Sequence, residues 1–180
     1  VAVTGEEFVL LSLLEVLVST RADGESLRSA FLRARRSGAL DEIPGLVYAN
    51  GQADGLAEEL VDTGIQRLVG DLDELPHPAI GYRLLEAPSG SAELGSNALP
   101  VDRVARYSPV ASLVLTFGCK FNCPYCPIPA YNQRQHRVKS GVRIADEFER
   151  LNREFGIHYF FGADDNFFND QKRTLEIIET

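Results

Sequence analysis

The 180-residue sequence has no methionine, three cysteines and comparatively few basic residues, and the shortage of basic residues already excludes one class of partner. Lysine and arginine number 18 against 26 aspartates and glutamates, which gives a formal net charge of −8. An acidic surface of this kind repels phosphate backbones, so we expect no nucleic acid partner. The remaining composition, with 44% hydrophobic and 24% charged residues, is typical of a soluble globular protein with one or two domains.

A long apolar run is also missing, because a membrane-spanning helix needs about 20 consecutive apolar residues. The most apolar stretch, residues 1–20, contains Glu6, Glu7 and Glu15 and has no basic leader, so we expect neither a signal peptide nor a membrane span. The initiator methionine is absent, and the C-terminal sequence TLEIIET stops within an expected helix. Both features favour a fragment of a longer gene product.

The three cysteines, Cys119, Cys123 and Cys126, lie together in the stretch FGCKFNCPYCPIP. A disulfide would use two of them and leave the third unpaired, and a tetrahedral zinc site would need a fourth ligand. Clustered thiols without pairing partners are typical of a reducing compartment, so we expect a cytoplasmic protein.

Hydrophobic periodicity and turn residues predict the organisation of the first half of the chain. Helices are expected at 8–18 and 26–36, and a short strand at 46–49. The dipeptide Asn50-Gly51 after this strand is a strong hairpin-turn signal. Proline, glycine and serine then accumulate over residues 73–100, which predicts a linker or an irregular connection.

The second half alternates strands and helices. We expect a strand at 111–116, a helix at 142–155, a strand at 157–161 and a helix that begins at Asn169 or Asp170. This order predicts a parallel α/β sheet or barrel, in which chemistry collects on the loops after the carboxyl ends of the strands. The cysteine loop and the sequence GADDNFF both occupy such positions.

Two alternatives for the cysteines follow from their spacing. The tetrad CPYC at residues 123–126 is also the active-site sequence of glutaredoxins, but there the second cysteine lies in a helix, and Pro127 and Pro129 obstruct that helix here. A zinc site of three cysteines and His136 or His158 also remains an alternative, although its spacing matches none of the usual paired patterns. Three buried structural thiols are disfavoured, because the loop is polar and rich in proline.

An iron–sulfur cluster fits the set of three cysteines best. Soft thiolates in a tight loop select such clusters. Three thiolates bind three irons of a [4Fe–4S] cube and leave the fourth iron open to another ligand, which is what a catalyst requires.

The stretch VLTFGCKFNCPYC, residues 114–126, resembles the radical S-adenosylmethionine (SAM) superfamily, with its C-x3-C-x2-C motif on the loop after the first strand of a βα barrel. The resemblance implies that Cys119, Cys123 and Cys126 ligate a [4Fe–4S] cluster. It also implies that SAM chelates the open iron through its amino and carboxylate groups. Reduction then cleaves SAM to a 5′-deoxyadenosyl radical that abstracts hydrogen from a substrate.

The sequence YFFGADDNFFND is similar to the second-strand segment in the cobalamin-linked branch of that superfamily. There, acidic residues at the strand end face the SAM amino group, and Asp164 and Asp165 match that position. Tyr125, the aromatic residue before the last cysteine, is a further SAM contact that the resemblance implies. A surface loop that caps a helix is the alternative for one of the two aspartates.

Residues 1–78 resemble the tail of the cobalamin-binding domain in the same branch. The expected fold is therefore α/β, with the start of a radical SAM (β/α) barrel preceded by the C-terminal tail of a Rossmann-like cobalamin-binding domain. The expected parts are a cobalamin-binding-type remnant at 1–75, a linker at 76–106 and the N-terminal part of the barrel at 107–180. The D-x-H-x-x-G loop that supplies the cobalt ligand in many members is absent, so no residue is assigned to cobalamin.

The resemblance implies a radical SAM enzyme with a small-molecule or lipid-like substrate and a reducing electron donor of the flavodoxin or ferredoxin type. Members of the cobalamin-linked branch catalyse methyl transfers, methylthiolations, ring closures and rearrangements, so the resemblance does not define the reaction. A (β/α) barrel usually needs about 200 residues or more, so we expect this segment to be inactive by itself. The alternative is a small iron–sulfur or zinc-binding module for electron transfer or structure, without SAM chemistry.

The stretch NQRQHRVKS, after the cysteine loop, is basic, with Arg134, His136, Arg137 and Lys139. It either steers or clamps an anionic group or forms a solvated loop.

Overall fold

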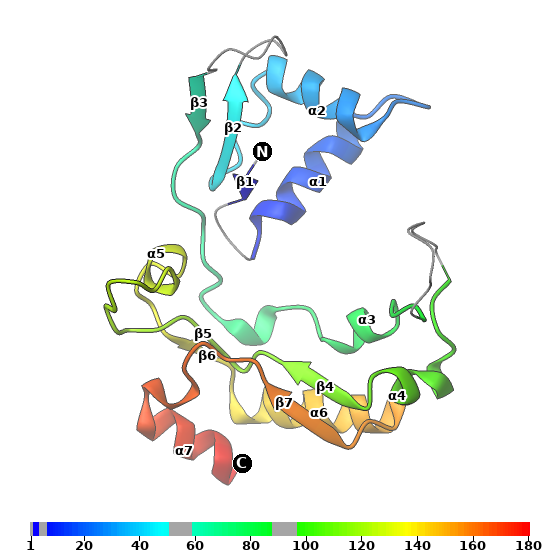
Figure 1. Ribbon diagram of the computed structural model, residues 1–180, viewed down its shortest axis with the longest axis vertical. Helices are drawn as coiled ribbons and strands as arrows, with labels where there is room; N and C mark the ends of the chain where they lie inside the picture. The colour runs from blue at the N-terminus through cyan, green and yellow to red at the C-terminus, as the bar shows by residue number, and fades with distance from the viewer. Residues whose placement is uncertain (1, 4–6, 51–58, 88–96) are drawn as a thin grey trace. The chain divides into compact units, whose positions relative to one another are not determined.

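The computed structural model describes residues 2–3, 7–50, 59–87 and 97–180 (Figure 1). It is a mixed α/β structure whose chain divides into two compact units, Val1–Val69 and Gly70–Thr180, called unit 1 and unit 2 below. The predicted α/β class is confirmed at this level. Within the described ranges, no helix has both the length and the apolar character that crossing a membrane requires.

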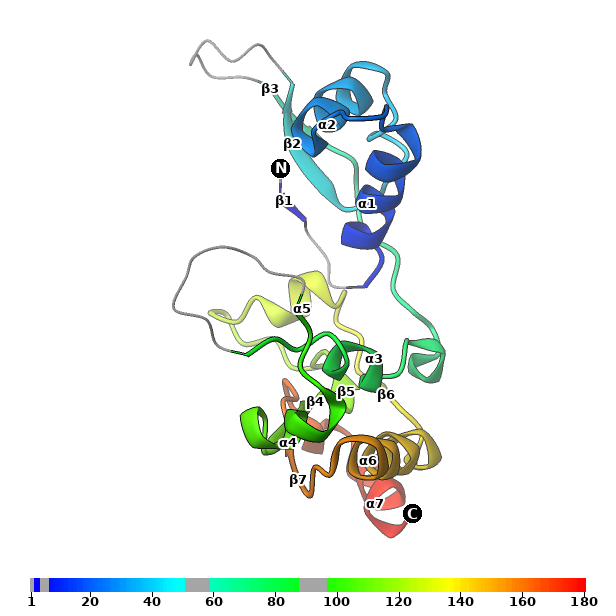
Figure 2. The same cartoon turned by 90° about the vertical axis from the view of Figure 1, so that its right-hand side faces the viewer.

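Unit 1 contains a small sheet with two helices on one side of it (Figures 1 and 2). Its elements are β1 (Ala2–Val3), α1 (Val9–Thr20), α2 (Leu27–Arg36), β2 (Leu46–Asn50) and β3 (Glu59–Asp62). The strand order is β1-β2-β3, and both pairings are antiparallel. A Rossmann-like sheet is mainly parallel. The antiparallel pairing therefore does not identify the Rossmann-like tail expected here, and that identity stays a prediction.

The two helices of unit 1 form because each has one apolar stripe. On α1 the buried residues are Val9, Leu13 and Leu17, which are four residues apart and so lie on one face. Helix α2 begins after Ser26, whose side-chain oxygen accepts a hydrogen bond from the Ser29 N–H group. Both predicted helices are confirmed, within two residues at each end.

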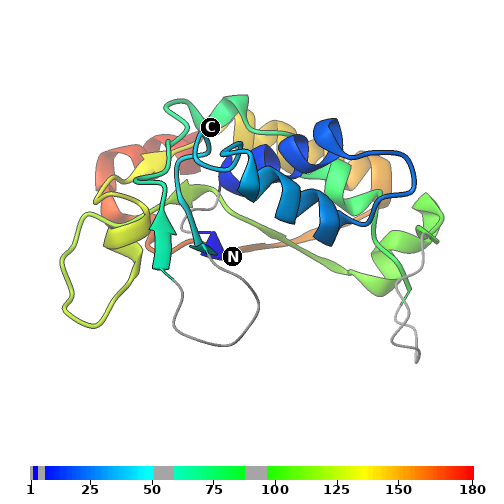
Figure 3. The same cartoon turned by 90° about the horizontal axis from the view of Figure 1, so that it is seen from above.

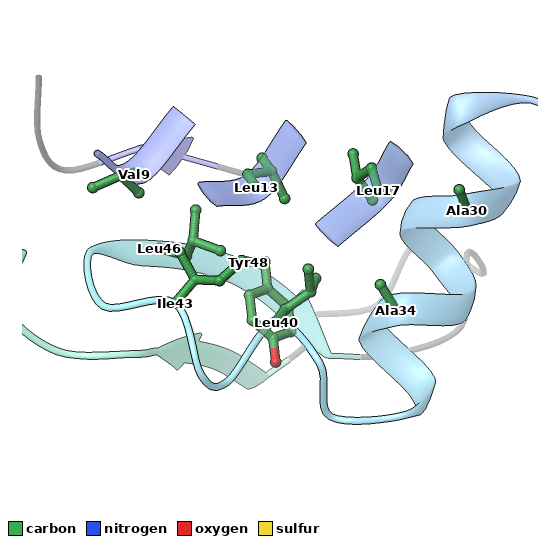
Figure 4. Close-up of a cluster of buried hydrophobic side chains, with 9 residues drawn as sticks. All are labelled: Val9, Leu13, Leu17, Ala30, Ala34, Leu40, Ile43, Leu46 and Tyr48. Atoms are coloured by element: carbon green, nitrogen blue, oxygen red, sulfur yellow. The ribbon is translucent and has the colours of Figure 1, made fainter. Parts of the chain in front are cut away.

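The core of unit 1 is an apolar cluster between α1, α2 and the sheet (Figure 4). Leu40 and Leu46 are fully buried in it, and the Tyr48 hydroxyl donates a hydrogen bond to Asp41 at its edge. The predicted strand at 46–49 is confirmed as β2, which pairs with β3 up to Asn50 opposite Glu59. The predicted turn at Asn50-Gly51 falls at the connection between β2 and β3, residues 51–58, which lies outside the described residues.

Unit 2 carries both loops that the sequence singles out. Its strands are β4 (Val110–Leu113), β5 (Thr116–Phe117), β6 (Arg137–Val138) and β7 (Tyr159–Gly162). Its α-helices are α3 (Ala79–Tyr82), α4 (Val104–Tyr107), α5 (Ile128–Tyr131), α6 (Gly141–Phe155) and α7 (Gln171–Glu179). Short 3₁₀ helices lie at Leu72–Glu74, Val101–Arg103 and Phe167–Asn169.

The centre of unit 2 is a parallel pair of strands covered by a helix. Strands β4 and β7 pair in parallel, as predicted, and the crossover between them contains α6. Helix α6 buries Ile144, Leu151 and Phe155 against this pair, and α7 lies beside it (Figures 1 and 2). The helix ends where predicted, because Gly156 adopts the left-handed φ of +70° that favours glycine.

Residues 76–106, the expected linker, contribute to the core of unit 2 in their described part. Ala79 on α3 and Val104 at the start of α4 are fully buried in the same cluster as β4 and α6. The stretch richest in serine and glycine, residues 88–96, lies outside the described residues. The assignment of the units to named domains stays a prediction.

Candidate functional site

The cysteine loop, residues 118–127, begins directly after β5. The sequence predicts one continuous strand over 111–116, which is wrong, because the structure ends β4 at Leu113 and starts a separate β5 at Thr116. Strand β5 pairs antiparallel with β6. The cysteine loop and α5 thus form the connection of a β5–β6 hairpin, coloured yellow-green in Figure 3, where it extends out from the end of β4.

The entrance to this loop requires glycine at position 118. Gly118 has a φ of +81°, which a residue with a Cβ atom rarely adopts. A Cβ atom there would lie 2.1 Å from the Gln135 carbonyl oxygen and 2.9 Å from Cβ of Asn132. The chain therefore turns into the cysteine loop in close contact with the segment that leads to β6.

The three cysteines are free thiols on an irregular loop, as the prolines predict. Cys119 and Cys126 are half-buried, Cys123 is exposed, and the Cys126 N–H group donates to the Cys123 carbonyl at 3.1 Å. Helix α5 begins only at Ile128, so neither cysteine of the CPYC tetrad lies in a helix. This geometry disagrees with the glutaredoxin alternative, whose second cysteine needs a helical position.

Three free thiols on one short loop fit an iron–sulfur cluster in donor chemistry. In the described part of the chain, no three Cys, His, Asp or Glu side chains are already gathered at metal-binding distances. Tyr125, the aromatic residue before the last cysteine, is 87% exposed. The thiol set is thus available on the loop, and its convergence on a cluster is a prediction.

The loop after β7 lies along the start of the cysteine loop, and three consecutive side chains connect the two. Asp164 accepts hydrogen bonds from the Leu115 and Thr116 N–H groups, at 2.9 and 2.5 Å, and from the Thr116 hydroxyl at 2.9 Å. These bonds satisfy the Leu115 and Thr116 N–H groups at the point where β4 gives way to β5, so they explain the break in the predicted strand.

The next two residues continue the same contact. Asp165 accepts a hydrogen bond from the Gly118 N–H group at 3.2 Å, and the Asn166 side-chain amide lies 3.8 Å from Sγ of Cys119 as a donor. The predicted neighbourhood of the two strand-end loops is therefore observed. Sequence reasoning missed Asn166, and its position directly after the Asp-Asp pair was the signal that could have found it.

The carboxylates of Asp164 and Asp165 differ in how many hydrogen bonds they accept within the protein. The Asp164 carboxylate is half-buried and accepts from three donors of Leu115 and Thr116, at the start of β5, which is a structural role. Asp165 is exposed beside the cysteine loop and accepts from Gly118. The structure therefore favours Asp165 over Asp164 as a residue that can meet a ligand.

The basic stretch after the cysteine loop is only partly available for an anion. Lys139 is buried in an ion pair with Glu147, at 2.9 Å to both carboxylate oxygens. Arg137 is also buried and donates to the Asn132 side chain at 3.0 Å. Of the basic residues predicted to steer an anion, Arg134 is the exposed one. Sequence reasoning missed Glu147, which lies on α6 outside the basic stretch, and it also missed Asn132, although Asn132 is the first residue of that stretch.

His136, in the same stretch, is held next to the loop after β7. Burial lowers the pKa of His136 below its ordinary value, and the charge of Asp170 and the backbone of Asn166 oppose this shift. His158, the other histidine considered for zinc, contacts the Asn152 side chain at 2.9 Å. Neither histidine joins the cysteines in a preformed set of three ligands among the described residues.

Comparison with curated proteins relates the chain to the radical SAM superfamily, in its cobalamin-linked branch. The chain is 28% identical over 151 residues to the hopanoid C-3 methylase of Methylococcus capsulatus, a match that covers 78% of this chain and 28% of that protein. It is 29% identical over 111 residues to the cytidylyl-2-hydroxyethylphosphonate methyltransferase of Streptomyces wedmorensis, covering 62% and 20%.

The most extensive match along this chain among these relatives is to a cyclase. The anaerobic magnesium-protoporphyrin IX monomethyl ester cyclase of Cereibacter sphaeroides is 22% identical over 166 residues, which are 90% of this chain and 24% of that protein. The chain thus spans less than a third of the length of these curated relatives. No family model matches the chain, and no solved structure gives a match.

Proposed function

We propose that the chain carries the cofactor loop of a radical SAM enzyme, in which Cys119, Cys123 and Cys126 hold a [4Fe–4S] cluster. The observation that carries this proposal is the set of three free thiols on the loop after β5, which follows the parallel strand β4, together with the hydrogen bonds that join this loop to the loop after β7. When bound and reduced, such a cluster supplies the electron that cleaves SAM to a 5′-deoxyadenosyl radical.

Asp165 is the residue that we propose for the SAM amino group. Its carboxylate is exposed, and its bond to the Gly118 N–H group keeps it beside the cysteine loop. A carboxylate that accepts from an amine forms a charge-assisted hydrogen bond, which is stronger than a neutral one. Tyr125, exposed next to Cys126, is a second candidate for contact with SAM. Asp164 instead holds the backbone of Leu115 and Thr116 at the start of β5.

We propose the start of a (β/α) barrel for unit 2, because β4, α6 and β7 form a parallel strand–helix–strand unit followed by α7. The tail of a cobalamin-binding domain remains our proposal for unit 1. Two of the relatives are a methyltransferase and a methylase, so we propose methyl transfer as the reaction class of the whole protein, with cyclisation as the alternative that the third relative supports.

Anaerobic reconstitution of the 180-residue chain with iron and sulfide tests the cluster directly. We expect about four irons and four sulfides per chain. Replacing Cys119, Cys123 or Cys126 singly by Ala should abolish the cluster, since each removes one thiolate. One equivalent of zinc without sulfide would instead identify a structural or electron-transfer module and refute the enzyme proposal.

Asp165→Asn tests the SAM contact in the reconstituted chain. Asn keeps an oxygen that can accept from the Gly118 N–H group but removes the charge, so the cluster should still assemble. The affinity for SAM should fall by about 1–3 kcal/mol, roughly 5- to 150-fold, the cost of losing a charge-assisted hydrogen bond. Equilibrium dialysis with SAM measures this, and Asp170→Asn, a cap of α7, is the matched control. Equal SAM affinity in wild type and Asp165→Asn would remove Asp165 from the site.

A further inference from the structure

The Asn166 side chain points to the sulfur of Cys119 at 3.8 Å, as a hydrogen-bond donor. Asn166 is half-buried and follows the two aspartates that hold the β4–β5 backbone and Gly118. The donor therefore meets one of the three thiols in particular, the half-buried one at the start of the loop. In the described residues, Cys123 and Cys126 receive no such side-chain donor.

Asn166 stands at a position where its side chain would ordinarily have another role. It precedes the 3₁₀ helix Phe167–Asn169, and asparagine at such a position commonly caps the helix by accepting from the backbone. Here the side chain makes no capping bond. By contrast, Ser140 and Asp170 cap α6 and α7 with their side chains. The amide of Asn166 is thus turned away from its own backbone and towards Cys119.

The backbone on both sides of the Asn166 side chain is held in place, which makes this orientation specific. The Asn166 carbonyl accepts from the Asn169 N–H group at 3.2 Å. The preceding residue, Asp165, is bonded to Gly118. Both ends of the contact are therefore held, because Gly118 precedes Cys119 directly and its backbone is confined by the Gln135 carbonyl and the Asn132 side chain.

We propose that Asn166 is a positioning residue for the cluster, one that donates a hydrogen bond to the Cys119 thiolate and raises the reduction potential; this inference rests on the proposed function. A thiolate that accepts an N–H bond carries less negative charge towards its iron. Reduction adds negative charge to the cluster, so such a bond stabilises the reduced form. The loop after β7 would then set the ease of reduction of a cluster held by the loop after β5.

Redox titration of the reconstituted chain, followed by electron paramagnetic resonance, tests this. Asn166→Ala should shift the midpoint potential to a more negative value, because the donor is lost. Asn166→Gln, which retains an amide donor, should lie closer to wild type. Asn122→Ala is the matched control, because Asn122 is exposed on the cysteine loop. The midpoint potential of the cluster in this variant should equal that of wild type.

The outcomes separate this inference from the proposed function. A wild-type chain that assembles a cluster, together with an unchanged potential in Asn166→Ala, would overturn the inference alone. An equal shift in Asn122→Ala would also overturn it, because the effect would then be general to the loop. A wild-type chain without a cluster would overturn both proposals. Where Asn166→Ala fails to fold, Asn166→Asp keeps the size but replaces the donor with an acceptor, and its potential should be more negative still.

Discussion

Unit 1 and unit 2 are of comparable secondary structure content but are stabilised differently. The buried side chains described in unit 1 are apolar apart from Gln66 and the Tyr48 hydroxyl, and none of them is charged. Unit 2 has an apolar cluster as well, but it also buries charged residues, Arg137, Lys139 and Glu147. The difference coincides with the candidate site, which lies wholly in unit 2.

In unit 2, charged side chains connect loops and strand ends to the neighbouring elements. Glu147 on α6 is fully buried and pairs with Lys139, just after β6, and with Arg143 one turn earlier on α6. Asp164 connects the loop after β7 to Leu115 and to Thr116 at the start of β5. Polar contacts of this kind need specific geometry. They fix a loop in one position, whereas apolar contacts stabilise without fixing direction.

The largest effect that this comparison predicts comes from Glu147→Ala. Removing the carboxylate leaves Lys139 and Arg143 next to each other without a counter-ion, and Lys139 is 7% exposed. Breaking a buried pair in this way costs about 3–5 kcal/mol. Hydrogen exchange read by mass spectrometry should show lower protection across unit 2. Glu149→Ala, on the same helix in an exposed pair with Arg153, should change stability by less than about 1 kcal/mol.

Leu46→Ala tests the apolar side of the comparison. Leu46 is fully buried in the cluster of unit 1, so its truncation should cost about 2–5 kcal/mol. The loss of hydrogen-exchange protection should fall on unit 1. Leu60→Ala in β3, where the side chain is 68% exposed, is the control and should have little effect. Similar losses in the two variants would show that burial does not decide stability here.

Asp164→Ala should have an intermediate effect. The Leu115 and Thr116 N–H groups would lose their acceptor, at a cost of about 1–3 kcal/mol. Asp164→Asn retains a side-chain oxygen in the same place and should recover most of this loss. Urea unfolding of both variants measures it. If Asp164→Ala were as stable as wild type, the contact between the two loops would not depend on this carboxylate.

The smallest expected effect is a pH dependence of unit 2. Burial lowers the pKa of His77 from 6.5, and the nearby charges of Arg150 and Arg143 lower it further against Asp146 and Glu147. Because the folded state binds the proton less readily than the unfolded state, His77 stabilises the fold above pH 6.5, and this contribution is lost as the pH falls further. The lowered pKa of His136 acts in the same direction.

Urea unfolding at several pH values on either side of 6.5 measures this dependence. His77→Asn should flatten it, since an asparagine oxygen can replace the ring nitrogen that accepts from the Ala79 N–H group at 3.0 Å. An unchanged pH profile in His77→Asn would assign the dependence to His136 or to carboxylates.

Regular elements and their ends were predictable where one local signal decided them. Helix α6 follows from an apolar stripe between a serine cap and Gly156, and the parallel order of β4 and β7 follows from the alternation of strands and helices. The break between β4 and β5 was not predictable, because the residues around it, Leu113–Thr116, are apolar or β-branched and contain no glycine or proline. A side chain 48 residues away in sequence, Asp164, takes the hydrogen bonds that a continuous strand would need.

In the candidate site, too, some features follow from the sequence and others only from the tertiary structure. The sequence by itself determined that the three cysteines share an irregular loop, because Pro124, Pro127 and Pro129 exclude a helix through it, and that Gly118 begins it. Only the tertiary structure decided which polar neighbours serve the loop. Asp164 is engaged by backbone, Asp165 is exposed next to Gly118, and Asn166 reaches Cys119. The physical reason is that backbone conformation is set by local residues, whereas hydrogen-bond partners depend on which distant segments the fold brings within about 3–4 Å.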